Sequence, residues 1–218
     1  MRRLAIGDIH GCAVALNALL ERAAPTTEDV VVTLGDYVDR GPDSRGVIDA
    51  LLALDGQCEH IALRGNHEIM LLDAMASGSW LRPWLGYGGA ATLASYGESF
   101  ADIPDAHLNF LQNCLRPFYE CDTHFFVHAN VRPEMPLDEQ PDAALYWQKF
   151  GDPDPHVSGK TMVCGHTPQG SGLPARNEHA ICIDTKPYAS DGWLTCLDID
   201  SGTIWQANES GALRDGVL

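Results

Sequence analysis

Three short polar phrases decide the fold of this chain: Gly7-Asp8-Ile9-His10-Gly11, Gly35-Asp36-Tyr37-Val38-Asp39-Arg40-Gly41 and Arg64-Gly65-Asn66-His67-Glu68. They recur about 28 to 30 residues apart, which is the length of one βαβ unit. Each phrase follows an apolar, strand-like run, and the carboxyl ends of parallel strands meet at one edge of an open α/β sheet. The spacing therefore predicts a parallel sheet with a polar site at its strand ends.

The segments around these phrases alternate between strand and helix patterns. Strands are predicted over residues 4–6, 30–34, 60–63, 123–128, 161–164, 180–183, 194–199 and 203–206. Helices are predicted over residues 12–23, 44–54, 67–76 and 105–115. Asp200-Ser201-Gly202 is a turn signal that predicts an antiparallel hairpin from the last two strands. We expect one domain over residues 1–218, with a peripheral helical insert at about 77–116 and a proline-rich loop over 133–155.

Composition narrows the class of protein. With 218 residues, of which 45% are apolar, the chain can build one sizeable core. A formal charge of -16 opposes the phosphate backbone of nucleic acids, so nucleic acid is not an expected partner. No run approaches the roughly 18 apolar residues of a membrane span, and the first strand leaves no room for a signal peptide. Seven scattered cysteines form no disulfide framework, so we expect a soluble, cytoplasmic protein with no membrane partner.

Residues with metal-binding side chains stand directly after five of the predicted strands. The six candidate ligands are Asp8, His10, Asp36, Asn66, His128 and His166. Two divalent cations held close together need carboxylates to offset their charge, with imidazoles at the remaining positions. Asp8 and His10 can address one ion from a single strand end, while Asp36 at the next strand end can bridge to a second. The pattern predicts a two-metal enzyme.

The order of these motifs resembles that of the PPP-type (calcineurin-like) metallophosphatase family. Gly-Asp-x-His-Gly, Gly-Asp-x-Val-Asp-Arg-Gly, Gly-Asn-His-Glu, a lone histidine after a strand and Gly-His-Thr occur here in the family's order, over nearly the whole chain. Gly88-Gly89 and the phrase from Val127 to Pro133 are most similar to small bacterial and bacteriophage-lambda-type serine/threonine protein phosphatases. The resemblance implies an α/β fold, a four-layer αββα sandwich of two mixed β-sheets.

The resemblance also assigns ligands to each metal. One ion would take Asp8, His10 and Asp36, and the other would take Asp36, Asn66, His128 and His166. A hydroxide between the two ions would attack phosphorus in line, because two cations lower the pKa of bound water toward ~7. Mixed oxygen and nitrogen ligands suit Mn²⁺, our preferred ion, with Fe or Zn as alternatives.

Three further residues take catalytic roles by the same resemblance. His67 would protonate the leaving oxygen, Asp39 would orient that imidazole, and Arg40 would bind the phosphate oxygens. The chain departs from the family at Lys149, where relatives commonly place a second phosphate-binding arginine, because lysine keeps the charge but loses the planar fork. It also has Lys186 where relatives often have glycine, and this side chain can contact substrate or face solvent.

The expected activity is hydrolysis of phosphomonoesters, with phosphoserine or phosphothreonine of proteins preferred and small phosphoesters as further substrates. Two alternatives stay open from the sequence. One is a symmetric dinucleoside tetraphosphate hydrolase, which shares these motifs. The other is a catalytically silent phosphatase fold that serves as a binding module.

Overall fold

Strands and helices alternate through the first third of the chain, and strands dominate the last third. The computed structural model describes residues 1–218. Its strands are β1 (Arg3–Ile6), β2 (Val30–Thr33), β3 (Glu59–Ala62), β4 (Phe118–Glu120), β5 (His124–Val127), β6 (Thr161–Cys164), β7 (Ala175–Arg176), β8 (Ala180–Cys182), β9 (Leu194–Asp198), β10 (Thr203–Ala207) and β11 (Leu213–Val217). Its α-helices are α1 (Ala13–Ala23), α2 (Ser44–Leu54), α3 (Asn66–Ala76), α4 (Gly78–Trp84), α5 (Ala90–Tyr96), α6 (Asp105–Asn109) and α7 (Asp142–Trp147).

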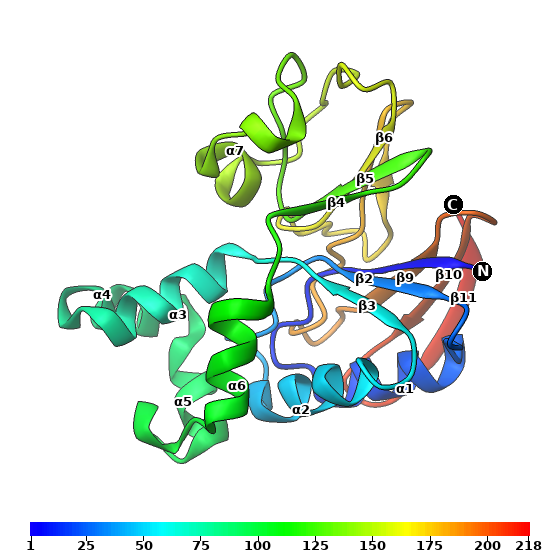
Figure 1. The fold of residues 1–218 in the computed structure, drawn as a ribbon. Coiled ribbons are helices and arrows are strands. Elements are labelled where there is room, and N and C mark those ends of the chain that lie inside the picture. Colours follow the sequence, from blue (N-terminus) through cyan, green and yellow to red (C-terminus); the bar gives the residue numbers. More distant parts are fainter.

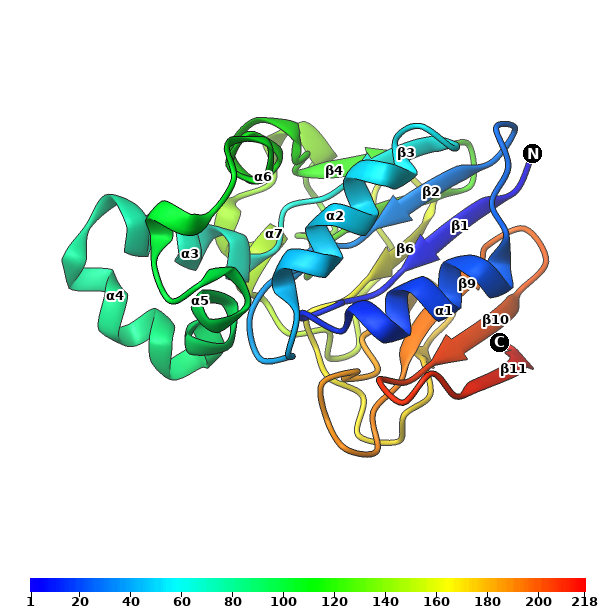
Figure 2. The same cartoon turned by 90° about the horizontal axis from the view of Figure 1, so that it is seen from below.

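The strands form two sheets that stack on each other, with helices on their outer sides (Figure 1). The larger sheet has the strand order β11-β10-β9-β1-β2-β3, and the smaller has the order β4-β5-β6-β8-β7. Both sheets are mixed. In the larger sheet β1, β2 and β3 are parallel while β9 pairs antiparallel with β1, and in the smaller sheet β5 and β6 are parallel while β4 pairs antiparallel with β5. In Figure 2, α1 and α2 cross the outer face of the larger sheet. The expected fold class, two mixed sheets in an α/β sandwich, is confirmed.

Alternation along the strands sorts apolar side chains into separate layers. In β5, Phe126 belongs to the core between the sheets, whereas Phe125 and Val127 belong to the core beneath α7. In β1, Ala5 faces the core between the sheets, and its neighbours face the helices α1 and α2. Strands buried on both faces read as continuous apolar runs, which is why β2 is Val-Val-Val-Thr.

The hydrogen-bonded pairing brings the polar phrases to one edge. β1 pairs in parallel with β2, and β2 with β3, so the three strands end side by side. In the second sheet β5, β6 and β8 are also parallel neighbours, and β5 and β6 lead directly to two of the candidate ligands. The predicted hairpin of β9 and β10 is confirmed as antiparallel.

The structure corrects the sequence expectation in several segments. The prediction of loop throughout 133–155 is wrong in part, because α7 lies within it and packs Leu145 and Tyr146 on the second sheet. The helix predicted over 105–115 begins as α6 and continues as a π-helical turn, Phe110–Cys114. Strands β4, β7 and β11 are additional. These strands lie at the sheet edges and are short or half exposed, so their apolar pattern is weak.

No helix of the protein is both long and apolar enough to cross a lipid bilayer.

An ion pair between the partly exposed Arg2 and the buried Asp29 joins the starts of β1 and β2, and it gives stability a predictable pH dependence. Asp29 accepts hydrogen bonds from the Arg2 guanidinium at 2.7 Å and from the Thr26 backbone N–H at 2.9 Å. The Arg2 guanidinium holds the pKa of Asp29 below its usual range. Because the native pKa is lower than the unfolded one, the stabilisation is present at neutral pH and is lost as pH falls below about 4.

We therefore expect Asp29→Asn to lower the free energy of unfolding by about 1.5 to 3 kcal/mol at pH 7, and by less near pH 3. Urea unfolding at both pH values measures the difference, and the exposed Asp191→Asn is the matched control. An equal loss at both pH values would contradict the ionic origin of the effect.

Candidate metal centre and active site

Five site residues at the ends of strands have left-handed backbone. They are His10 (φ 47°), Asp36 (φ 51°), Asp39 (φ 72°), Arg40 (φ 71°) and His166 (φ 62°). Residues with a Cβ rarely take this conformation, and it persists only where surrounding contacts impose it. Glu68 supplies such contacts, because its buried carboxylate accepts the backbone N–H groups of Asp36 at 2.9 Å and Tyr37 at 2.8 Å. The first turn of α3 thus fixes the loop after β2.

Three acceptor atoms meet at one side of Asp36. Asn66 Oδ1 lies 3.0 Å from His128 Nε2 and 2.9 Å from His166 Nδ1. The other nitrogen of each imidazole faces a backbone carbonyl, Leu34 O at 2.8 Å for His128 and Trp147 O at 3.2 Å for His166. A neutral imidazole has one proton for two facing oxygens, so with the backbone carbonyl as its acceptor the lone pair of each ring points at the amide oxygen.

The Asp36 carboxylate joins this group and a second one. Its Oδ1 lies 3.4 Å from His128 Nε2, and its Oδ2 lies 3.4 Å from His10 Nε2. His10 Nδ1 lies 2.9 Å from Val38 O, an oxygen that can only accept a proton, so the lone pair of this imidazole lies at Nε2, where Arg40 approaches it. Donor atoms within 4.8 Å of one another form two groups: His10 with Asp36 and His67, and Asp36 with His128 and His166. Asp36 is the shared member.

Asp8 is buried beside these groups and accepts the backbone N–H of His166 at 2.9 and 3.1 Å. Burial and the nearby Asp184 and Asp36 raise the pKa of Asp8. Burial also raises the pKa of Asp184, to about 6, although the backbone N–H of Lys186 opposes that rise. Three buried carboxylates at one place are costly unless cations offset them. Together with the converging lone pairs, they form a donor set that fits two divalent cations.

Beside this centre, His67 and Asp39 form a buried pair. His67 Nδ1 lies 2.6 Å from Asp39 Oδ2, and both side chains are buried. Burial opposes the charged imidazole, but the carboxylates of Asp36 and Asp39 raise the pKa of His67 overall. An imidazole held in this way can keep a proton near neutral pH and release it to an acceptor.

Arg40 spans the two imidazoles that face the centre. Its Nη1 lies 2.7 Å from His10 Nε2, and its Nη2 lies 2.9 Å from His67 Nε2. Tyr188 holds the guanidinium from the other side, with its hydroxyl 3.2 Å from Nη1 and its ring centroid 4.8 Å from the guanidinium carbon. The planar fork therefore lies where it can bind two oxygens of one phosphate.

A cavity of about 450 Å³ opens onto this site. Arg40, Asn66, His67, Met70, Asp73, Trp80, Tyr87, Trp147, Lys149 and His166 line it. Trp80, Tyr87 and Trp147 are exposed aromatic walls. Lys149 donates from Nζ to His166 O at 3.3 Å, so its ammonium lies at the rim. The cavity combines apolar walls with a cationic floor, as binding sites for small organic groups often do.

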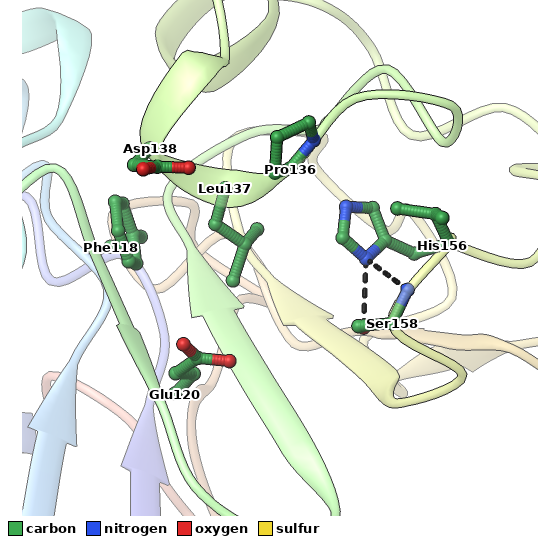
Figure 3. Close-up of a pocket in the computed structure, with 8 residues that line it drawn as sticks. Phe118, Glu120, Pro136, Leu137, Asp138, His156 and Ser158 are labelled. Carbon is green, nitrogen blue, oxygen red and sulfur yellow. Dashed lines mark hydrogen bonds between the residues drawn. The ribbon is translucent and has the colours of Figure 1, made fainter.

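A second cavity, of about 430 Å³, lies beside the second sheet between β4 and the 136–138 turn (Figure 3). Its one imidazole, His156, faces Ser158 Oγ at 2.8 Å and Met135 O at 2.8 Å, so neither ring nitrogen points into the cavity as a free ligand. Two acidic side chains, Glu120 and Asp138, also line it. No catalytic or metal-binding set is found there.

The structure gathers the six candidate ligands and the three candidate catalytic residues around one centre, and Lys149 reaches it only from the rim. The first donor group contains His67 where the sequence suggested Asp8. Lys186 is exposed and does not line the cavity. Sequence reasoning missed Tyr188, Trp84 and Thr92, which contact Arg40 or Asp39. Only Gly88-Gly89, which separates Trp84 from Thr92, marked that region as unusual.

Two curated relatives align with part of the chain. Serine/threonine-protein phosphatase 1 of Salmonella typhimurium is 46% identical over 85 residues, which are 38% of this chain and 37% of that protein. The symmetrical bis(5'-nucleosyl)-tetraphosphatase of Erwinia tasmaniensis is 34% identical over 138 residues, which are 61% of this chain and 45% of that protein. The chain thus aligns with less than half the length of each of these relatives.

Solved structures share the fold at low identity. A cold-active protein-tyrosine phosphatase of a psychrophilic Shewanella species superposes with a TM-score of 0.68 at 16% identity, covering 98% of this chain and 80% of that one. A serine/threonine phosphatase of Saccharomyces cerevisiae superposes with a TM-score of 0.63 at 16% identity, covering 91% and 73%. At such identities the likeness concerns the fold alone.

The family description of the calcineurin-like phosphoesterases matches residues 1–194, which is most of the chain. That family hydrolyses phosphoesters with a pair of metal ions, and the two donor groups around Asp36 could hold such ions. The chain belongs to the calcineurin-like phosphoesterase family.

Proposed function

We propose that the protein hydrolyses phosphomonoesters with two bound divalent cations, and that phosphoserine and phosphothreonine of proteins are its preferred substrates. The observation that carries this proposal is the set of imidazole nitrogens and carboxylates that meet at Asp36, next to a cavity lined by Arg40. The 46% identity to Serine/threonine-protein phosphatase 1 over 85 residues supports the choice of substrate.

Asp8, His10 and Asp36 would hold one cation, and Asp36, Asn66, His128 and His166 the other. When bound, the cations would supply positive charge opposite the phosphate oxygens and allow a water molecule to lose its proton near neutral pH. Mn²⁺ is the proposed ion, because mixed oxygen and nitrogen donors suit it, with Fe and Zn as alternatives.

The chain's own side chains would position the ester and supply the proton. Arg40 would bind phosphate oxygens through its fork, and Lys149 would add charge from the rim. Since Arg40 Nη2 lies 2.9 Å from His67 Nε2, a phosphate held by Arg40 brings its ester oxygen near that imidazole. His67 would donate its proton to this oxygen, and Asp39 would hold the imidazole in place.

We further propose that residues 1–218 act as a single domain in the cytoplasm. All seven cysteines are free, and a reducing compartment keeps thiols unpaired.

A second candidate activity is hydrolysis of a symmetric dinucleoside tetraphosphate. The exposed rings of Trp80, Tyr87 and Trp147 support it, because aromatic walls beside a phosphate site offer stacking surfaces to a nucleobase. The alignment with the tetraphosphatase of Erwinia tasmaniensis points in the same direction.

A substrate panel separates these activities. Chelator-treated protein would receive Mn²⁺, Fe²⁺ or Zn²⁺ singly, with a phosphoserine peptide, p-nitrophenyl phosphate or diadenosine tetraphosphate as substrate. We expect metal-dependent release of phosphate from the peptide, strongest with Mn²⁺. Faster formation of nucleotides from the tetraphosphate would support the second activity instead. If no ester is hydrolysed with any of the three metals, the protein is a phosphatase fold that binds its ligand without catalysis.

A further inference from the structure

We propose that Trp84 and Thr92, from the helical segment between α3 and β4, are positioning residues that hold the Asp39 carboxylate against His67. The inference rests on the proposed function, in which His67 donates a proton to the leaving oxygen. It gives a catalytic purpose to a segment, residues 77–116, that supplies none of the candidate metal ligands.

Both oxygens of Asp39 are occupied by donors of known direction. Oδ2 lies 2.6 Å from His67 Nδ1 and accepts the indole N–H of Trp84 at 2.9 Å. Oδ1 accepts the hydroxyl of Thr92 at 2.7 Å. Asp39 has no exposed surface, so no water competes for these positions. The carboxylate therefore cannot rotate away from His67 without leaving buried donors unpaired, which is costly.

The Thr92 hydroxyl also fixes the backbone of Asp39. Its oxygen accepts the Asp39 backbone N–H at 2.8 Å and lies 3.1 Å from Ser44 Oγ. A hydroxyl has one proton, and the charged Oδ1 takes it, so Ser44 must donate to Thr92. One side chain thus binds Asp39 both as donor and as acceptor, at a residue whose φ of 72° needs external support.

Two glycines, Gly88 and Gly89, shape the turn that packs against the Trp84 indole. A Cβ on Gly89 would overlap the ring of Trp84, so the close approach of backbone and indole requires glycine there. Gly88 has a φ of 112° and accepts the Arg40 backbone N–H at 3.2 Å through its carbonyl. The turn that aims Trp84 at Asp39 thus also supports Arg40.

Burial alone would make Trp84 and Thr92 parts of a core, so the test must separate positioning from stability. Thr92→Val keeps the shape of the side chain and removes the hydroxyl, Thr92→Ser restores the hydroxyl, and Trp84→Phe removes the indole N–H. Tyr96→Phe is the matched control, because it removes a buried hydrogen bond of the same segment, from the Tyr96 hydroxyl to His107 Nδ1 at 2.8 Å.

Each variant is assayed with p-nitrophenyl phosphate, whose leaving group departs without a proton, and with a phosphoserine peptide, whose alkoxide needs one. We expect Thr92→Val and Trp84→Phe to lower kcat on the peptide about 10- to 100-fold, with KM unchanged and a loss of less than about 3-fold on the aryl ester. Thr92→Ser should recover most of the rate, and Tyr96→Phe should keep it.

A second readout needs no turnover. In metal-free protein, the Nδ1 proton of His67 should give a downfield NMR resonance in the wild type and in Thr92→Ser, and the resonance should shift or broaden in Thr92→Val. If Thr92→Val and Trp84→Phe lose equal activity on both substrates, or if Tyr96→Phe shows the same loss, the inference is overturned. The proposed function is tested separately by His67→Asn, and it stands if that variant loses activity selectively on the peptide. A non-selective loss in His67→Asn would remove the proton-donor assignment itself. If Trp84→Phe fails to fold, the comparison of Thr92→Val with Thr92→Ser still tests the inference.

Discussion

Asp36→Asn is expected to reduce turnover of an aryl phosphate on the order of 10³-fold or more. The two carboxylate oxygens of Asp36 face different imidazoles, His128 and His10, each at 3.4 Å. An asparagine keeps one oxygen and turns an NH₂ group toward the other metal position, which repels a cation. Asparagine also tolerates a φ of 51°, so the variant should fold.

The measurements are kcat at saturating Mn²⁺ and the number of metal ions bound per chain. We expect about one ion in place of two. Asp138→Asn makes the same chemical change at an exposed carboxylate in the second cavity and should keep both values. Turnover above about a tenth of wild type would overturn the two-metal assignment, since a shared carboxylate cannot be dispensable.

His67→Asn is expected to lower kcat on a phosphoserine peptide by about 10²- to 10⁴-fold, which is the usual contribution of a general acid. The loss on p-nitrophenyl phosphate should be much smaller, because that leaving group is stable as an anion. The structural reason is the position of Nε2, which lies 2.9 Å from Arg40 Nη2 at the floor of the cavity.

The chain contains a matched control for this variant. His60 also pairs with a carboxylate, with its Nδ1 2.7 Å from Asp55, but it lies in β3 away from the cavity. His60→Asn should therefore leave both rates near wild type. The ratio of the two rates measures the effect, and an unchanged ratio in His67→Asn would show that the imidazole does not donate the proton.

Eight of the eleven strands and the first three helices could be predicted because their signals are local. A buried strand is a short apolar run, and Val30–Thr33 meets that description within one residue of the prediction. Asp43 could be named as a helix cap, and its side chain does accept the Gly46 N–H at 2.8 Å. Helix α7 was not predicted because it is six residues long, begins after Pro141 and is surrounded by turn residues.

The candidate ligands could also be found in advance. Parallel strands end at a common edge, so polar residues directly after them converge whatever the loops do. The same reasoning does not reach residues whose place depends on how helices pack. Trp84 and Thr92 lie 45 and 53 positions from Asp39, and Tyr188 lies 148 positions from Arg40. No strand periodicity links such pairs.

From the sequence alone came the parallel strands, the edge at which the site lies and the residue types that surround the candidate metal ions, while the two-sheet architecture was implied by the family resemblance. The first three depend on short-range repetition, of two residues in a strand and of one βαβ unit between phrases. Only the folded chain decided which donors face each other, which backbone carbonyl faces each imidazole, and that Thr92 of the helical segment contacts Asp39. Those outcomes depend on side-chain packing and burial between distant segments, which a linear pattern does not encode.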